Sequence, residues 1–185
     1  NYEAPHAHHV RALALQLFDA IGPRLGCRPA DRQTLADAAL LHDIGYHISY
    51  DDHHKHAYHL ISHARFVGVS PEEQLVMANV ARYHRGPTPK LRHRPYAQLT
   101  LAALLRIADG FDRGHVGAVQ RLETTLVDDA VRIVPVPDPR ATSMRLELWG
   151  ASRKSAFLAE LLGREVQVIG PDGRAVRPDD DDRVD

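Results

Sequence analysis

The sequence is poor in the features that mark secreted, membrane-spanning and nucleic-acid-binding proteins. Cys27 is the single cysteine of the 185-residue chain, which excludes an internal disulfide framework and fits a reducing compartment. No apolar run approaches the roughly 20 residues that a membrane-spanning helix needs, and no signal peptide is visible. The formal net charge is −1, so no global basic field points to nucleic acid. We therefore expect a cytoplasmic protein that binds neither membranes nor nucleic acid.

The composition is that of an ordinary globular protein, with 44% hydrophobic and 25% charged residues. The length suits one substantial core with a small appendage. The chain opens at Asn1 and not at a methionine, which is compatible with a fragment that lacks an N-terminal module.

Apolar residues at helical spacing predict five helices in the first two thirds of the chain. The clearest start is SPEE, where Ser70 can cap a helix and Glu73 completes a capping box. The expected helices cover about 4–21, a stretch from 31 to Gly45, the histidine cluster up to Val67, a stretch from 70 to about His84, and about 97–111. Beyond about residue 118, the pattern predicts strands at 121–127, 131–136 and 143–149, a helix at 152–163, and a hairpin of 165–169 with 174–176.

These elements predict a mainly α fold, a helical bundle followed by a small antiparallel β unit with one helix. We place the bundle at residues 1–118, the α/β appendage packed on it at 119–178, and a disordered acidic tail at 179–185. The β unit contains no evident catalytic residue, and we expect it to pack on the bundle or to form a homodimer contact.

Histidine is abundant, with thirteen in the chain, and several histidines follow apolar helical lines. His6, His42, His56 and His84 each lie on the inward line of a different predicted helix, and Asp43 and Asp109 lie beside such lines. A buried carboxylate costs several kcal/mol unless it is paired or bound to a cation. Imidazole and carboxylate groups that face one core can share a divalent metal ion, and Mn, Mg, Fe, Ni and Zn are all candidates.

Each of these residues also has an ordinary structural explanation. A lone histidine on an apolar face is usually a hydrogen-bonded core residue. Asp109 has Arg106 three residues before it and Arg113 four residues after it, so a helical ion pair would account for it. His84 near a helix end would interact well with the helix dipole. The coincidence of all six on separate segments favours the metal site.

The order of the motifs HAHHV, LLHDIG and RIADGFDR resembles the HD-domain superfamily of metal-dependent phosphohydrolases. The resemblance implies a helical bundle in which His6, His42, Asp43 and Asp109 hold a metal ion. Superfamily members with two ions add histidines from the intervening helices, and here His56 and His84 occupy the comparable stretches. His53 or His54 could take the place of His56, because the start of that helix is uncertain by a few residues.

Longer stretches narrow the resemblance. LLHDIGYHISYDDHHKHAYHLI, NVARYHRGPTPKLRH, LAALLRIADGFDR and LELWGASRKSAFLAELLGREVQV look like the C-terminal helical domain of the exopolyphosphatase and guanosine pentaphosphate phosphatase (Ppx/GppA) family. In that family this domain usually follows an actin-like ATPase-fold module, which has no counterpart here. The exopolyphosphatase reaction is therefore not carried over to this chain. Some family members have lost the metal motif of the helical domain, whereas this sequence retains it, which favours a working site.

The resulting hypothesis is a phosphohydrolase with one or two divalent ions, acting on a phosphate ester or anhydride such as a nucleotide or a related small molecule. With one ion, Asp43 would orient or deprotonate the attacking water, and with two it would bridge them. Lys55 and Arg85 are the predicted catalytic cations, and Lys55, Arg82, Arg85 and Arg113 are the predicted substrate-binding residues. The main alternative is a non-catalytic regulatory domain that binds phosphate, polyphosphate or a guanosine alarmone. A third and weaker hypothesis is a pH sensor that uses the histidines without a metal ion.

Overall fold

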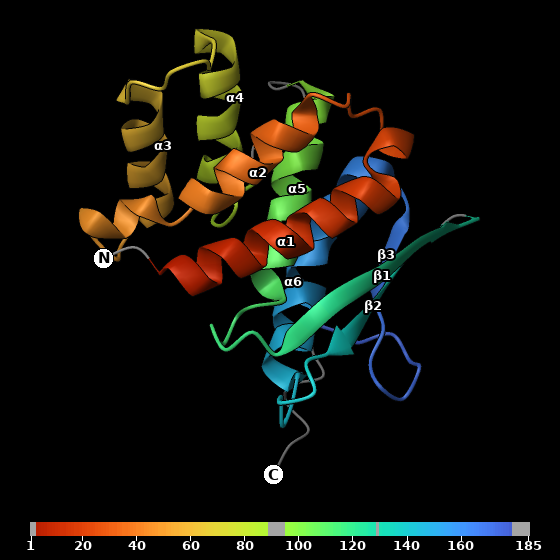
Figure 1. Cartoon of the computed structure of the whole chain (residues 1–185). Helices are drawn as coiled ribbons and strands as arrows, with labels where there is room; N and C mark the ends of the chain where they lie inside the picture. The colour runs from red at the N-terminus through yellow and green to blue at the C-terminus, as the bar shows by residue number, and fades with distance from the viewer. Residues whose placement is uncertain (1–2, 89–94, 129, 179–185) are drawn as a thin grey trace.

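The computed structural model describes residues 3–88, 95–128 and 130–178 (Figure 1). Six α-helices, two short 3-10 helices and three strands make up this part of the chain. Their bounds are α1 (Ala4–Ile21), η1 (Pro23–Leu25), α2 (Asp31–Leu41), η2 (Ile44–His47), α3 (His53–His63), α4 (Pro71–Arg82), α5 (Tyr96–Gly110), β1 (Val119–Val127), β2 (Ala130–Pro137), α6 (Arg145–Leu162) and β3 (Glu165–Val168). The predicted fold class, a mainly helical domain with a small β unit, is confirmed. In the described ranges no helix is long and apolar enough to cross a membrane.

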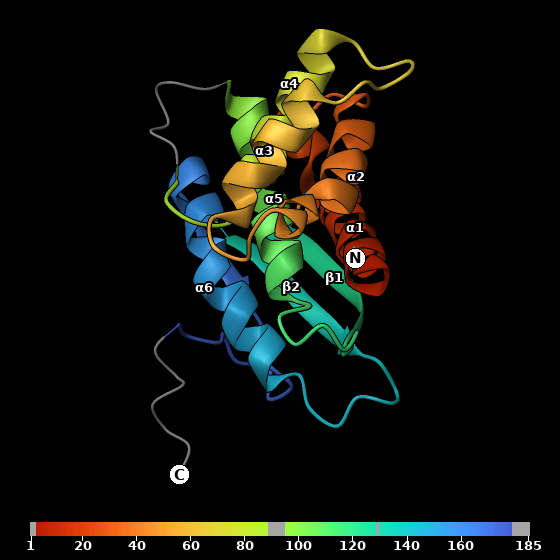
Figure 2. The same ribbon diagram turned by 90° about the vertical axis from the view of Figure 1, so that its left-hand side faces the viewer.

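Helix α5 is the central element of the bundle. Its sequence, YAQLTLAALLRIADG, is apolar on nearly every side, and most of its side chains are buried. A helix with this pattern must be surrounded, and α1, α2, α4 and α6 all pack against it (Figures 1 and 2). The C-terminal end of α5, which carries Asp109, therefore lies where several helices meet.

The sheet has the strand order β1-β2-β3. Strands β1 and β2 form the predicted antiparallel pair, but β3 runs parallel to β2. A parallel neighbour requires a crossover connection, and α6 provides it. The expected hairpin at the end of the chain is reduced to one antiparallel bridge between Ile169 and Ala175.

Two predicted element boundaries are wrong. The segment 143–149, expected to be a strand, consists of two residues without regular structure followed by the first residues of α6. Its apolar residues alternate, but Met144, Leu148 and Ala151 also lie at helical spacing, and these three are the buried ones. Helix α3 ends at His63 and not at Val67, whose side chain is fully exposed.

The apolar core is continuous from the helices to the sheet. Val119, Ile133 and Leu158 belong to the same buried cluster as the side chains of α1 and α5. The division of the chain at residue 118 stays a prediction, and the tail predicted at 179–185 lies outside the described residues.

Helices α5 and α6 cross at two glycines. A Cβ atom added to Gly110 would lie 2.7 Å from the Cα of Ala151, and one added to Gly150 would lie 2.8 Å from the carbonyl oxygen of Gly110. Both distances are too short for any side chain, so the two backbones touch at this crossing. The contact presents the middle of α6 to the end of α5.

We predict that Gly110→Ala destabilises the protein by about 1–3 kcal/mol, because the added methyl group forces the α5 and α6 backbones apart. In an unconstrained helix the same change would stabilise by roughly 0.5–1 kcal/mol, so the sign of the effect is diagnostic. Chemical denaturation measures the free energy of unfolding. Ala156→Ser, at an exposed position of α6, is the control. A Gly110→Ala variant as stable as the parent chain would contradict the close crossing.

Candidate metal centre

Four imidazole rings and two carboxylates converge at one end of the bundle. Four of them, from three segments, lie at or just beyond helix ends, so they reach the same space without a long loop. The six residues are His6 of α1, His42 and Asp43 directly after α2, His53 at the start of α3, His84 after α4, and Asp109 of α5.

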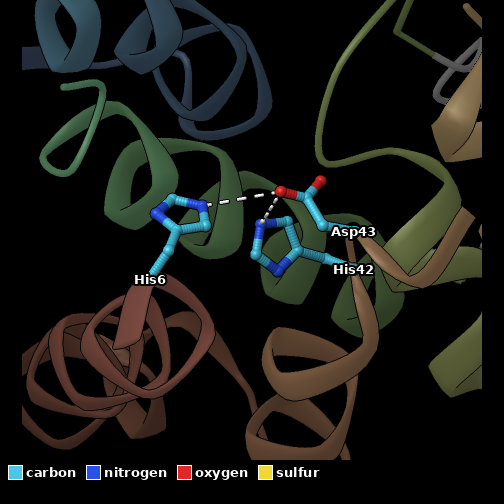
Figure 3. A group of neighbouring side chains, drawn as sticks. All are labelled: His6, His42 and Asp43. Carbon is cyan, nitrogen blue, oxygen red and sulfur yellow. Dashed lines mark ion pairs between the residues drawn. The ribbon is translucent and has the colours of Figure 1, made fainter. Parts of the chain in front are cut away.

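The first group is built around one oxygen of Asp43. The Oδ2 atom of Asp43 lies 3.6 Å from Nε2 of His6 and 3.4 Å from Nε2 of His42, and the three side chains point toward one another (Figure 3). The Oδ1 atom of Asp109 completes the group, at 3.5 Å from His6 Nε2 and 3.9 Å from His42 Nε2. These four residues are those that the HD resemblance implies as metal ligands.

The second group uses the other oxygen of Asp43. Its Oδ1 atom lies 3.2 Å from Nε2 of His53 and 3.5 Å from Nε2 of His84, and the two nitrogens are 3.3 Å apart. Asp43 therefore faces two sets of nitrogen donors, one with each oxygen. Both sets are spaced closely enough for their donor atoms to share an ion.

Three of the rings are oriented by their own backbone. In His42, His53 and His84 the Nδ1 atom donates a hydrogen bond to the carbonyl oxygen three residues earlier, at 2.7, 3.0 and 2.7 Å. A carbonyl oxygen only accepts, so Nδ1 carries a hydrogen, and in the neutral form of each ring the lone pair lies on Nε2. Each lone pair is thereby directed at Asp43, which is the arrangement found around metal-bound histidines.

His6 is oriented instead by a carboxylate that the sequence analysis missed. Its Nδ1 atom lies 2.8 Å from Oδ2 of Asp112, which is buried and also faces His9 at 3.1 Å and the backbone N–H of Gly117 at 2.9 Å. Burial would raise the pKa of Asp112, but the hydrogen bonds from His6 and His9 outweigh it and lower the pKa to about 2. Asp112 is thus ionised and holds the His6 ring in place.

The electrostatics of the two groups suit a cation. Burial alone would raise the pKa of Asp43, but its contacts with the rings of His53, His42 and His84 hold that pKa well below its usual value. Burial lowers the pKa of His84 far below 6.5, so this ring is neutral at pH 7. Burial also lowers the pKa of His6, but Asp109 and Asp112 outweigh this and raise it to about 9.

Two buried ring nitrogens support the fit of a metal ion. The Nε2 atoms of His6 and His42 are shielded from solvent and have no hydrogen-bond partner among the described residues. An unsatisfied buried polar atom costs about 1–3 kcal/mol, and coordination to a cation removes that cost. A mixed set of imidazole nitrogens and carboxylate oxygens suits Mn, Fe, Ni or Zn better than Ca.

A pocket of about 290 Å³ opens onto both groups. Asp43, His53, His84 and Asp109 of the two groups line it. The other lining residues are mostly cationic or aromatic, namely Tyr46, Arg85, Arg113, His115, Trp149, Gly150, Arg153 and Lys154. A small anion that enters this pocket reaches the candidate metal ligands between positive charges.

Three predicted site residues, His56, Lys55 and Arg82, lie outside the two groups and the pocket. His56 is half-buried and belongs to neither group, because α3 begins at His53 and its inner face follows His53, Ala57 and Ile61. That face lies about 60° around the helix from the line through His56. Lys55 is exposed and pairs with Asp52 at 2.7 Å, away from the pocket.

Of the three arginines predicted to bind substrate, two lie at the pocket and one does not. Arg85 and Arg113 line the pocket, whereas Arg82 does not. The guanidinium of Arg82 lies over the ring of Tyr83, 5.6 Å from its centroid. Arg82 and Arg85 lie close to His84 in sequence, but only Arg85 reaches the pocket.

The sequence analysis also missed pocket residues that depend on long-range packing. His115 stacks on the His6 ring with centroids 3.8 Å apart, and its backbone has a positive φ of 55°. Trp149, Arg153 and Lys154 come from α6, and Lys154 forms an ion pair with Asp109. Interpretation of residues 143–149 as a strand removed any reason to place α6 at the site.

The comparison with protein families gives a match to Ppx/GppA phosphatase, domain III, over residues 1–141. The matched range contains all six residues of the two groups, together with Arg85 and Arg113, and it ends before α6. It covers about three quarters of the chain, and the chain therefore belongs to the family of Ppx/GppA phosphatase domain III.

Proposed function

We propose that this protein is a metal-dependent phosphohydrolase that acts on a phosphate ester or anhydride, with a nucleotide or a related small molecule as substrate. The observation that carries the proposal is the position of Asp43, whose two carboxylate oxygens face two separate groups of buried imidazole nitrogens. Membership of a phosphatase family and the cationic pocket above these groups also support it.

The donor set has room for two divalent ions. One would be held by His6, His42, Asp43 and Asp109, and the other by Asp43, His53 and His84. When bound, such ions supply a water molecule of lowered pKa and polarise a phosphoryl oxygen. The nitrogen and oxygen donors are compatible with Mn, Fe, Ni or Zn, and Mg is a further candidate.

The chain's own residues would prepare the substrate. Arg85 and Arg113 line the pocket and can pair with phosphoryl oxygens, where negative charge grows during attack at phosphorus. Burial and the charge of Asp43 raise the pKa of Tyr46 to about 12, so its hydroxyl stays protonated and can donate a hydrogen bond.

A second candidate is a ligand-binding domain without catalysis. The matched family description names the third domain of a phosphatase, which is compatible with a domain that binds phosphate, polyphosphate or a guanosine alarmone on behalf of another module. A screen of phosphorylated compounds with Mn, Mg, Ni and Fe separates the two functions. Absence of turnover together with a nucleotide-dependent rise in melting temperature would favour this second candidate.

We predict that Asp43→Asn lowers the bound metal by at least half and reduces turnover by roughly 100-fold or more, because it removes the negative charge that faces both groups of imidazole nitrogens. Elemental analysis of protein purified without chelator and a phosphatase assay measure the two effects. Asp37→Asn is the control, since that carboxylate accepts a hydrogen bond from Gln33 on the surface of α2. Full metal content in the Asp43→Asn variant would refute the ligand assignment.

We also predict that His53 and His56 differ in their effect on metal content. His53→Gln should remove about one of two bound ions, because it breaks the second group only. His56→Gln should leave both ions in place, since its ring belongs to neither group. Elemental analysis of the two variants measures the number of ions per chain. The reverse result would restore the sequence-based assignment of His56.

The raised pKa of His6 makes metal binding dependent on pH. Because the pKa is about 9, the metal-free ring is protonated at pH 7, and an incoming cation must displace that proton. We predict release of about one proton per chain from His6 at pH 7, falling toward zero as the pH rises past 9. Calorimetric titrations in buffers of different ionisation enthalpy measure it. An unchanged proton release in His6→Gln would contradict the assignment.

A further inference from the structure

Helix α6 lies beyond the part of the chain that matches the family, yet it forms one wall of the pocket over the candidate metal centre. Trp149, Arg153 and Lys154 of this helix line the pocket. Arg153 and Lys154 are cations, and the chemistry proposed above gives neither of them a role.

The glycine crossing explains why α6 reaches the site. Gly150 touches the backbone of Gly110, which directly follows Asp109 in α5. Lys154 lies one turn after Gly150 on the same face of α6. The close approach of the two helices therefore places the Lys154 ammonium against the Asp109 carboxylate, where the two form an ion pair.

Lys154 and the first metal group use different oxygens of Asp109. The ammonium of Lys154 binds Oδ2, whereas Oδ1 faces Nε2 of His6 at 3.5 Å. The Lys154 side chain is 19% exposed, and Asp109 is its single hydrogen-bond partner among the described residues. An ammonium has three N–H donors, so Lys154 retains donors on a group that borders the pocket.

If the only role of Lys154 were to neutralise Asp109, its ammonium would not need to border the pocket. Lys154 shares this wall with Arg153, and Arg113 approaches it from the end of α5. Three positive charges, two from α6 and one from the turn after α5, thus border the space above two ionised carboxylates. This arrangement fits a bound anion that lies between the cations and the metal ligands.

We propose that Lys154 is a phosphate-binding residue of this site, anchored on Asp109 and directing its other N–H donors at phosphoryl oxygens. The inference rests on the proposed function, because it assigns a residue to the substrate of that reaction. It also makes α6, from outside the family-matched range, a determinant of which phosphorylated compounds bind.

The test uses Trp149, the single tryptophan of the chain, which lines the same pocket. Its fluorescence is followed as inorganic phosphate is added to the metal-loaded full chain, with metal content measured in parallel. Lys154→Met should weaken phosphate binding roughly 10- to 100-fold, the usual effect of losing a charge-assisted hydrogen bond. Lys154→Arg should restore binding to within a few fold. Arg164→Met, an exposed cation just after α6, is the matched control.

The outcomes separate a binding role from a structural one. A phosphate affinity that is unchanged in Lys154→Met at full metal content would overturn the proposal, even if the melting temperature falls. Lys154→Gln serves as the second neutral variant if Lys154→Met does not fold. With a turned-over substrate, the loss should raise KM more than it lowers kcat. Lys154-dependent phosphate binding without any turnover would support this inference and reject the proposed enzymatic function.

Discussion

The sharing of Asp43 between two sets of imidazole rings is the interaction on which the site depends. Its Oδ2 atom faces His6 and His42, and its Oδ1 atom faces His53 and His84. Four separate segments must therefore end within a few ångströms of one carboxylate. The buried, nearly all-apolar helix α5 provides the common support, because the other helices pack around it. Folding of the bundle and assembly of the site are consequently one process.

Close backbone contacts bring these segments together. A Cβ atom at Gly45 would lie only 1.9 Å from the carbonyl oxygen of His53, so the turn after Asp43 can approach the start of α3 only without a side chain. Gly110 and Gly150 do the same for α5 and α6. At these places only glycine allows the two backbones to come so close, and this close approach sets the distances between the donor groups.

How much of the site could be predicted from the sequence depends on the range of the interactions. An ionisable residue on an apolar helical line is a local signal, and it indicated His6, His42 and His84. Asp43 and Asp109 lie beside such lines. The histidine-rich start of α3 offers several helical phases, so the pattern could not separate His56 from His53. Lys154 depends on a crossing with a helix 45 positions earlier in the chain, and no spacing within α6 reports that contact.

The backbone hydrogen bonds of His42, His53 and His84 have an evolutionary consequence. The carbonyls that hold these rings belong to positions 39, 50 and 81, and a carbonyl is present whatever side chain the residue carries. Two of them lie in the last turn of a helix, where carbonyl groups lack partners within the helix. The orientation of each ring thus depends on the three-residue spacing between the histidine and the carbonyl, and not on which side chain the carbonyl residue carries. Point substitutions at these positions leave it intact, whereas a one-residue insertion between ring and carbonyl would erase it.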